Sequence, residues 1–280
     1  KAPKEKAQKV AKTQAVIDAE ALYHEATTDS TVIRIKDDSE STEVVWNSVN
    51  EFKDIYCKKP INTLNQQVSS FKFMKLLRDC VHINKVKSKD DNTAFMGNHL
   101  KEVNGILGRK KENVAYTTML VLDVDDGDID IKDMKAYFHK RRLASVLYTS
   151  WSACVDKPNR YRVVVMADRA MNQDEHEAIY KHLIKDINSW FKCYTPTCVA
   201  DKERILKDNP DALFSGIDAS KINLSSMFYL PAQNPEHRDA YQVYLNYGQN
   251  SICVNKNLLK VDAYLLSSGY LSEEDESIEL

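Results

Sequence analysis

Residues 119–127 read Met-Leu-Val-Leu-Asp-Val-Asp-Asp-Gly, an apolar run that ends in carboxylates. Successive side chains of a β-strand alternate between its two faces, so Asp123 and Asp125 are expected to share one face. Two carboxylates at this spacing lie roughly 6.5–7 Å apart and can share divalent cations held about 4 Å from each other. Acids at the end of a buried strand are costly unless a metal, a cation or water neutralises them. The stretch therefore predicts a metal site at the end of a strand.

The pattern around this stretch predicts a sheet covered by helices. From Val114 to Asp125 the residues are apolar on both faces, which is typical of a central strand. The order strand, helix, strand, strand, helix, strand indicates an α+β fold and is compatible with an RRM-like core. Expected strands are 31–36, 43–46, 114–125, 144–150, 160–167, 228–230 and 240–247; expected helices are 4–26, 48–57, 69–81, 131–142, 172–191 and 257–266; residues 192–217 are expected to be irregular.

Composition narrows the class of protein. Apolar residues make up 43% and charged residues 29% of the chain, with a net charge of −2, so a nucleic-acid site must be a local basic patch. Six scattered cysteines with no C-x-x-C pair predict reduced thiols in a cytosol-like compartment. A zinc cluster of His182, Cys193 and Cys198 is conceivable, but its spacing fits no strong zinc pattern. No apolar run approaches the ~20 residues that span a bilayer.

Other charged groups could complete a site. Arg160 and Arg162 open an apolar strand at the same i, i+2 spacing, and two guanidinium groups on one face suit a triphosphate or a nucleic-acid backbone. Pairing with surface acids is an equally open interpretation of these two arginines. The basic run at 108–111 could contact phosphates, although a lone basic run is more often solvated. Asp218 could add a third carboxylate, although an Asp after Gly216-Ile217 is commonly a turn residue.

The acid motif also has partial likeness to two other kinds of site. A phosphatase of the haloacid-dehalogenase kind uses a strand that ends in D-x-D-G-T, with its first Asp as nucleophile. Here the sequence is D-V-D-D-G-D, with an additional Asp before the Gly and no Thr, which disfavours that class. An EF-hand loop that starts at Asp123 requires Gly at position 128 and Glu at position 134. The chain carries Asp128 and Met134, which excludes the EF-hand.

Five motifs occur in order along the chain. They are Leu-Val-Leu-Asp-Val-Asp-Asp-Gly at 120–127, Leu-Tyr-Thr-Ser-Trp-Ser at 147–152, Lys-Pro-Asn-Arg-Tyr-Arg-Val-Val-Val at 157–165, Gly-Ile-Asp-Ala-Ser-Lys-Ile-Asn at 216–223 and Phe-Tyr-Leu-Pro at 228–231. Together they resemble one known family, the archaeo-eukaryotic primase superfamily. The likeness is greatest to the primase-polymerase domains of plasmid, phage and mobile-element replication proteins, and it covers roughly residues 105–232. It implies the archaeo-eukaryotic primase fold, with an RRM-like catalytic sheet and an N-terminal α/β part.

The resemblance implies a role for each matching residue. Asp123 and Asp125 would bind catalytic Mg²⁺ or Mn²⁺, with Asp218 as the third acidic ligand. Ser152 would lie in the nucleotide-binding turn, and Arg162 would contact the phosphates of the incoming nucleotide. The expected nucleotide-binding set is Ser152, Ala153, Arg160, Arg162, Arg109 and Lys111.

The second motif departs from the family pattern. Relatives carry a histidine that contacts the triphosphate, whereas Ala153 stands at that position and no histidine occurs between His139 and His176. We expect Ala153 to weaken nucleotide affinity, and an Ala153→His substitution to raise it.

The resemblance implies a DNA primase or template-directed DNA polymerase that acts in replication of a mobile element. Its partners would be NTP or dNTP, a single-stranded DNA template and a replicative helicase domain or subunit, with no membrane, in a bacterial cytoplasm and encoded by a plasmid or phage. The alternatives are a catalytically degenerate DNA-binding replication initiator and, less favoured, the haloacid-dehalogenase-type phosphatase. The expected organisation is a helical extension at 1–30, a catalytic domain at 31–255 with its motif-bearing core at 105–232, and a C-terminal helix and acidic tail at 256–280.

Overall fold

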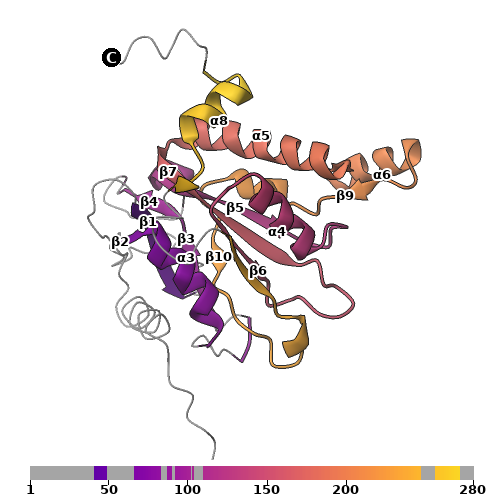
Figure 1. Ribbon diagram of the computed structural model, residues 1–280, viewed down its shortest axis with the longest axis horizontal. Helices are drawn as coiled ribbons and strands as arrows, with labels where there is room; N and C mark the ends of the chain where they lie inside the picture. Colours follow the sequence, from indigo (N-terminus) through magenta and orange to yellow (C-terminus); the bar gives the residue numbers. More distant parts are fainter. Residues whose placement is uncertain are drawn as a thin grey trace, which may run out of the picture.

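A five-stranded antiparallel sheet forms the centre of the molecule (Figure 1). The computed structural model describes residues 41–48, 66–82, 87–89, 92–101, 103, 110–246 and 256–271. The expected helix at 4–26, the strand at 31–36 and nearly all of the helix at 48–57 lie outside the described residues. The sheet order is β11 (Val243–Asn246), β6 (Ser145–Thr149), β7 (Tyr161–Met171), β5 (Val114–Val124) and β4 (Asn98–Leu100).

Strand β5 is central because its side chains are buried on both faces. Leu120 and Leu122 belong to one hydrophobic core, and Met119 and Val121 belong to the other. Alternation along the strand therefore assigns Asp123 to the same face as Met119 and Val121. The expectation of a central strand with two buried faces is confirmed.

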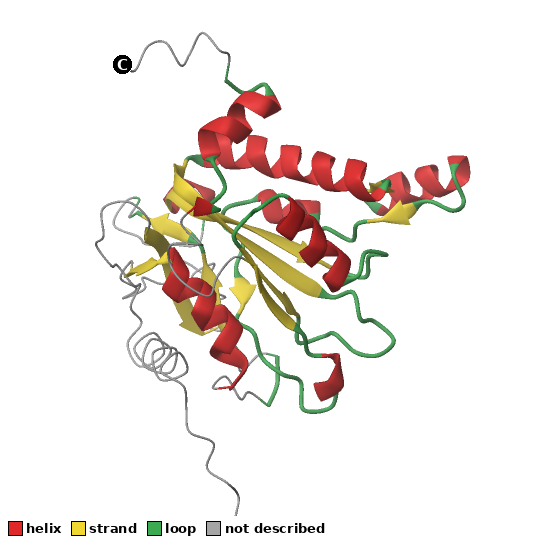
Figure 2. Cartoon of the chain, viewed as in Figure 1, coloured by secondary structure: helices red, strands yellow, loops and turns green. Residues whose placement is uncertain are grey.

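Three helices cover the first face of this sheet (Figure 2). They are α4 (Ile131–Lys140), α5 (Gln173–Phe191) and α8 (Val261–Ser268). Asp130 caps α4 by accepting a hydrogen bond from the Lys132 amide. Asn172 caps α5 in a reciprocal capping box with Glu175, which satisfies amide groups that a helix start leaves unpaired.

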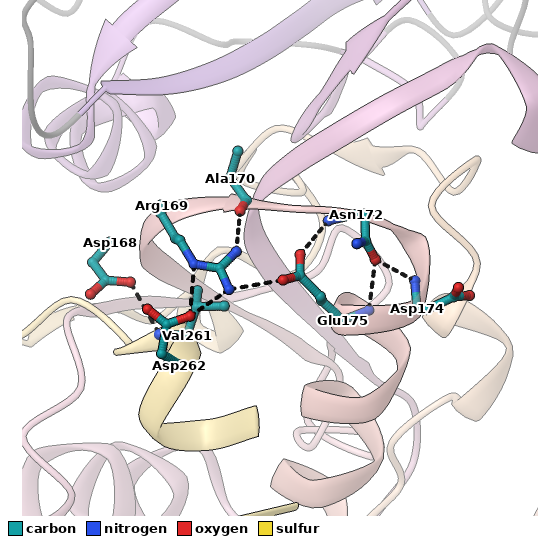
Figure 3. A network of polar contacts seen from close by, with 8 residues as sticks. All are labelled: Asp168, Arg169, Ala170, Asn172, Asp174, Glu175, Val261 and Asp262. Carbon is teal, nitrogen blue, oxygen red and sulfur yellow. Dashed lines mark hydrogen bonds and ion pairs between the residues drawn. The ribbon is translucent and has the colours of Figure 1, made fainter. Parts of the chain in front are cut away.

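A polar network attaches α8 to the start of α5, as Figure 3 shows. The Arg169 guanidinium donates two hydrogen bonds: from Nη2 to Glu175 at 2.8 Å and from Nε to Asp262 at 3.0 Å. Asp168 accepts a hydrogen bond from the Val261 amide at 3.1 Å. Because these residues come from the end of β7 and from two helices, the network holds the C-terminal helix against the sheet.

A second, four-stranded sheet lies on the other side of the second core. Phe95 and Phe228 from this sheet pack 5.9 Å apart, and Phe73 of α3 (Ser70–Asp79) meets Phe95 edge-on at 5.4 Å. The same core includes Val121 and Val164 of the central sheet. The order is β10 (Phe228–Tyr229), β3 (Thr93–Met96), β1 (Ser41–Ser48) and β2 (Gln66–Ser69), all antiparallel.

The segment 192–217 is the main departure from the expected elements. It contains a helix, α6 (Val199–Asp208), and a short parallel pair formed by β8 (Cys193–Tyr194) and β9 (Leu213–Phe214). No residue of α6 is buried, and the segment contains Pro196 and Pro210, which favour irregular structure in a sequence-based interpretation. Short 3-10 helices are η1 (Cys80–His82), η2 (Lys111–Asn113), η3 (Ala219–Ile222) and η4 (Arg238–Ala240).

Most other expected elements are confirmed, with shifts at their ends. The strand expected at 240–247 spans 243–246, and the helix expected at 257–266 spans 261–268. No helix in the described part of the chain is long and apolar enough to cross a membrane.

Candidate active site

The end of β5 is joined to a segment far away in the sequence. Val124 forms an isolated antiparallel bridge with Ile217. The Asp125 amide donates to the Gly216 carbonyl, and the Asp218 amide donates to the Asp123 carbonyl, each at 2.8 Å. The loop after β9 therefore continues the hydrogen-bonding pattern of β5 and brings the backbone of Asp218 next to that of Asp123.

Two glycines make this close contact possible. A Cβ atom on Gly127 would lie 2.4 Å from the Ser215 carbonyl oxygen, and one on Gly216 would lie 2.5 Å from the Gly127 Cα. Gly216 also adopts a φ of +71°, which residues with a side chain rarely accept. The glycine that follows the acid motif is thus required by backbone packing.

Asp123 forms a buried ion pair with Arg162, its cross-strand partner on β7. The Arg162 Nε lies 3.0 Å from Asp123 Oδ1, and Nη2 lies 3.5 Å from Oδ2. Both residues are only 7% exposed. Burial alone would lower the pKa of the Arg162 guanidinium, but Asp123, Tyr148 and Asp125 together outweigh burial, so the pKa is raised and the group stays charged.

Aromatic residues enclose this pair. The Arg162 guanidinium lies 5.8 Å from the centre of the Tyr229 ring, and the Lys89 ammonium lies 5.3 Å from the same ring. The Tyr148 hydroxyl donates to the Tyr229 carbonyl at 2.9 Å, which connects β6 to β10. Tyr229 thus contacts two cations of the site.

Asp125 and Asp126 follow the end of β5 and have different environments. Desolvation first, and then the charge of Asp123, raise the pKa of Asp125. Asp126 adopts a left-handed φ of 54° and accepts two hydrogen bonds from the Arg160 guanidinium, the Nε bond being 2.7 Å. The hydrogen bond from Arg160 lowers the pKa of Asp126. Arg160 therefore pairs with Asp126 and leaves the Asp125 carboxylate without a bidentate partner among the described residues.

Asp218 directs its carboxylate toward its own helix. It caps η3 by accepting from the Ser220 amide at 2.9 Å, and it lies 3.4 Å from the Lys221 ammonium. Only its backbone hydrogen bond reaches Asp123. The alternative interpretation of Asp218 as a turn residue is therefore what the local geometry shows.

A cleft of about 520 Å³ opens at these residues. Its size falls within the range of small-molecule sites, roughly 300–1,000 Å³. Its walls are formed by residues of β5, β7, the turn after β6, η3 and β10. Carboxylates and cations both lie in these walls. The cleft lining includes Asp123, Asp125, Arg160, Arg162, Lys221 and Trp151.

The expected nucleotide-binding residues differ in their placement. Ser152 lines the cleft with Arg160 and Arg162. Ala153 is 3% exposed and lies outside the cleft lining, because its backbone closes the preceding turn. Lys111 is exposed in η2, where its charge acts on Glu177 of α5, and it does not line the cleft. Arg109 lies outside the described residues.

Some residues of the cleft were not identified from the sequence. Lys89 and Tyr229 line it although no acid or arginine motif contains them. Tyr229 belongs to the Phe-Tyr-Leu-Pro motif, so the sequence could have indicated it as a site residue. Lys89 lies in a polar stretch without any motif, so nothing in the sequence indicated it. Lys221 lines the cleft and follows Asp218 by three residues, the spacing of an ion pair on one helical turn.

The acidic residues fit a divalent cation only as a pair. In the described part of the chain, no three His, Cys, Asp or Glu side chains are grouped closely enough to hold a metal ion. Asp123, Asp125 and Asp218 are thus not assembled into one ligand set, because Asp218 is engaged by Ser220 and Lys221. Mg²⁺ is commonly held by one or two carboxylates together with substrate phosphates, and Asp123 and Asp125 line the cleft as such a pair.

This fold and site define an α+β protein with an acidic pair and a group of cations in one cleft. The chain belongs to the VapE N-terminal domain family, whose sequence profile matches residues 20–195, more than half of its length. No curated protein matches the chain.

One solved structure similar to this chain is the AEP domain of the cyanophage S-2L primase-polymerase (PP-N190). Sequence identity is 11% and the TM-score is 0.39, over 89% of this chain and 96% of that one. The α+β fold class expected from the sequence is confirmed by the strands and helices described above.

Proposed function

We propose that this chain is a metal-dependent nucleotidyltransferase of the primase-polymerase kind, which extends or starts strands on a single-stranded DNA template during replication of a mobile element. One observation supports this most directly: Asp123 and Asp125 line the same cleft as Arg160, Arg162 and Lys221. A nucleoside triphosphate needs cations for its phosphates and carboxylates for the divalent cation that accompanies it.

Each group of side chains has a distinct task in this proposal. Arg160 and Arg162 would hold the triphosphate through charge-assisted hydrogen bonds, which planar guanidinium groups form well. Asp123 and Asp125 would hold Mg²⁺ or Mn²⁺, which when bound stabilises negative charge on the transferring phosphoryl group. In the structure Arg162 is the ion-pair partner of Asp123. On nucleotide binding, Arg162 would pair with the phosphates and Asp123 with the divalent cation. Tyr229 would keep Arg162 in place.

Primer extension on a single-stranded template with Mn²⁺ and labelled nucleotides tests this function. The double variant Asp123→Ala/Asp125→Ala is expected to abolish incorporation. A matched double variant, Asp133→Ala/Asp211→Ala, removes two exposed carboxylates outside the cleft and should leave incorporation unchanged. Incorporation that survives loss of both Asp123 and Asp125 would contradict the proposal.

One observation favours a second candidate, a DNA-binding replication initiator with degraded catalysis. Both acids already have partners: the Asp218 carboxylate is engaged by Ser220 and Lys221, and Asp123 is neutralised by Arg162. This candidate predicts no incorporation by any version of the protein, together with binding of single-stranded DNA that weakens as salt rises. Measuring both quantities on the same preparation separates the two functions.

The phosphatase alternative gains no support from the site. Its motif requires a Thr after the Gly, and this chain carries Asp128 there, whose carboxylate accepts a hydrogen bond from the Phe214 amide. Phosphate release from a small phosphomonoester, measured beside the extension assay, is expected to be absent.

A further inference from the structure

The turn that follows β6 holds Trp151 at a fixed place in the cleft. The Ala153 amide donates to the Ser150 carbonyl at 3.1 Å, so Trp151 and Ser152 are the two central residues of a β-turn. The Ser150 amide donates to the Arg160 carbonyl at 2.8 Å, which attaches the turn to the start of β7. The Asn234 side-chain amide donates to the Trp151 carbonyl at 3.3 Å. These bonds fix the turn from three sides.

Trp151 is an unusual residue for this position. Gly, Pro, Asn, Asp and Ser dominate β-turns because they supply the required backbone angles or hydrogen-bond the nearby backbone. Here a tryptophan stands between two serines, and all three residues line the cleft that contains the acid pair. Trp151 is half-buried, so the cleft rather than open solvent surrounds part of it.

The two aromatic residues of the cleft differ in what already contacts them. Tyr229 has the Arg162 guanidinium at 5.8 Å and the Lys89 ammonium at 5.3 Å from its ring centre. Among the described residues, no ring or cation contact is found for Trp151, whereas Tyr229 has two cations. In the described part of the cleft, the Trp151 ring is therefore the aromatic face available to a ligand.

We propose that Trp151 is the nucleobase-stacking residue of this cleft, with the phosphates of the same nucleotide held at Arg160 and Arg162. The inference rests on the proposed nucleotide-binding function and adds a base subsite to it. The backbone bond between Ser150 and Arg160 places the stacking residue beside the phosphate-binding residues. Stacking uses the face that every base has, so the subsite accepts purines and pyrimidines alike.

Calorimetry with two probes tests the base subsite. ATP carries both a base and a triphosphate, whereas inorganic tripolyphosphate carries the phosphates alone; both are titrated with Mg²⁺ into the wild type and into Trp151→Ala. Trp151→Ala is expected to weaken ATP binding about tenfold and to leave tripolyphosphate binding unchanged, since base–aromatic stacking has about this strength. Trp151→Phe keeps an aromatic face and should retain most of the ATP affinity.

A control variant and a second probe make each outcome decisive. Trp190→Phe changes a tryptophan that contacts Arg141 and lies outside the cleft, and it should bind both probes like the wild type. Equal ATP affinity for the wild type and Trp151→Ala overturns the base subsite and leaves the proposed function standing. Loss of both probes in Trp151→Ala also overturns it, because Trp151 would then support the phosphate site.

Two further results would show whether the Trp151 ring contacts a nucleotide at all. If Trp151→Ala weakens binding of a single-stranded oligonucleotide but not of ATP, the tryptophan contacts the template and the inference is wrong. If the wild type binds neither ATP nor tripolyphosphate, both the proposed function and the base subsite are overturned.

Discussion

Replacing Asp123 by asparagine removes the charge that the buried Arg162 guanidinium requires, while it keeps the size of the side chain. The two groups are 3.0 Å apart at Nε and Oδ1, and each residue is 7% exposed. Removal of one partner from a buried pair is strongly destabilising because it leaves an uncompensated charge in a poorly solvated place. We therefore expect Asp123→Asn to lower the free energy of unfolding substantially.

The size of this effect follows from burial. Breaking a buried pair costs about 3–5 kcal/mol, and the lower end applies here because the asparagine oxygen can still accept from Arg162. A loss of about 3 kcal/mol corresponds to a fall in Tm of roughly 6–12 °C for a domain of 150–250 residues. An exposed pair would lose only about 0–1 kcal/mol.

Urea denaturation followed by circular dichroism measures the effect, in a buffer with chelator so that divalent cations do not contribute. The double variant Asp123→Leu/Arg162→Met replaces both charges by apolar groups and is expected to recover most of the lost stability. Arg162→Met alone should be destabilised, because it leaves the buried Asp123 carboxylate without its ion-pair partner. An unfolding free energy of Asp123→Asn within about 1 kcal/mol of the wild type would refute the reasoning.

Three other predictions concern the loop contact, a helix cap and the acid pair. Gly127→Ala should cost about 1–3 kcal/mol in urea denaturation, because its Cβ would lie 2.4 Å from the Ser215 carbonyl oxygen; wild-type stability would contradict the close contact. Asn172→Ala removes the capping box of α5 and should cost about 1 kcal/mol with an unchanged m-value. The pKa of Asp125 is raised in the folded state, so the fold binds protons more tightly than the unfolded chain and its stability falls as pH rises above the ordinary aspartate pKa. Asp125→Asn should flatten that slope in Tm against pH, and an unchanged slope would count against it.

Local patterns in the sequence were sufficient to predict the elements that build the site. The apolar run of β5 and the amphipathic pattern of α5 predicted both elements and their burial. The alternation of side chains along a strand correctly placed Asp123 on the opposite face from Leu122. The spacing of Arg160 and Arg162 predicted that they share one face, and both line the cleft, while Arg160 also pairs with a surface acid, Asp126, as the alternative interpretation expected.

Pairing across the fold could not be predicted in this way. Which arginine meets which aspartate depends on the register of β5 against β7, which sets Asp123 opposite Arg162. The pairing of Arg160 with Asp126 further depends on the left-handed backbone of Asp126. The local turn that engages Asp218 competes with any metal site, and sequence spacing does not decide which arrangement forms. Helix α6 was not predicted because the segment 192–217 is rich in charges and contains Pro196 and Pro210, which are typical of irregular structure.

Hydrogen bonds hold the loop after β9 against the end of β5. We predict that this loop can separate from β5 locally, without unfolding of the whole domain. Asp128 and Phe214 exchange bonds across 86 positions of sequence, and the amides of Asp125 and Asp218 belong to the same contact. A segment that separates from the sheet without unfolding it exposes such amides together. Hydrogen exchange at these amides should therefore occur as one event, faster than in the centre of β5 and slowed by any ligand that binds across the cleft.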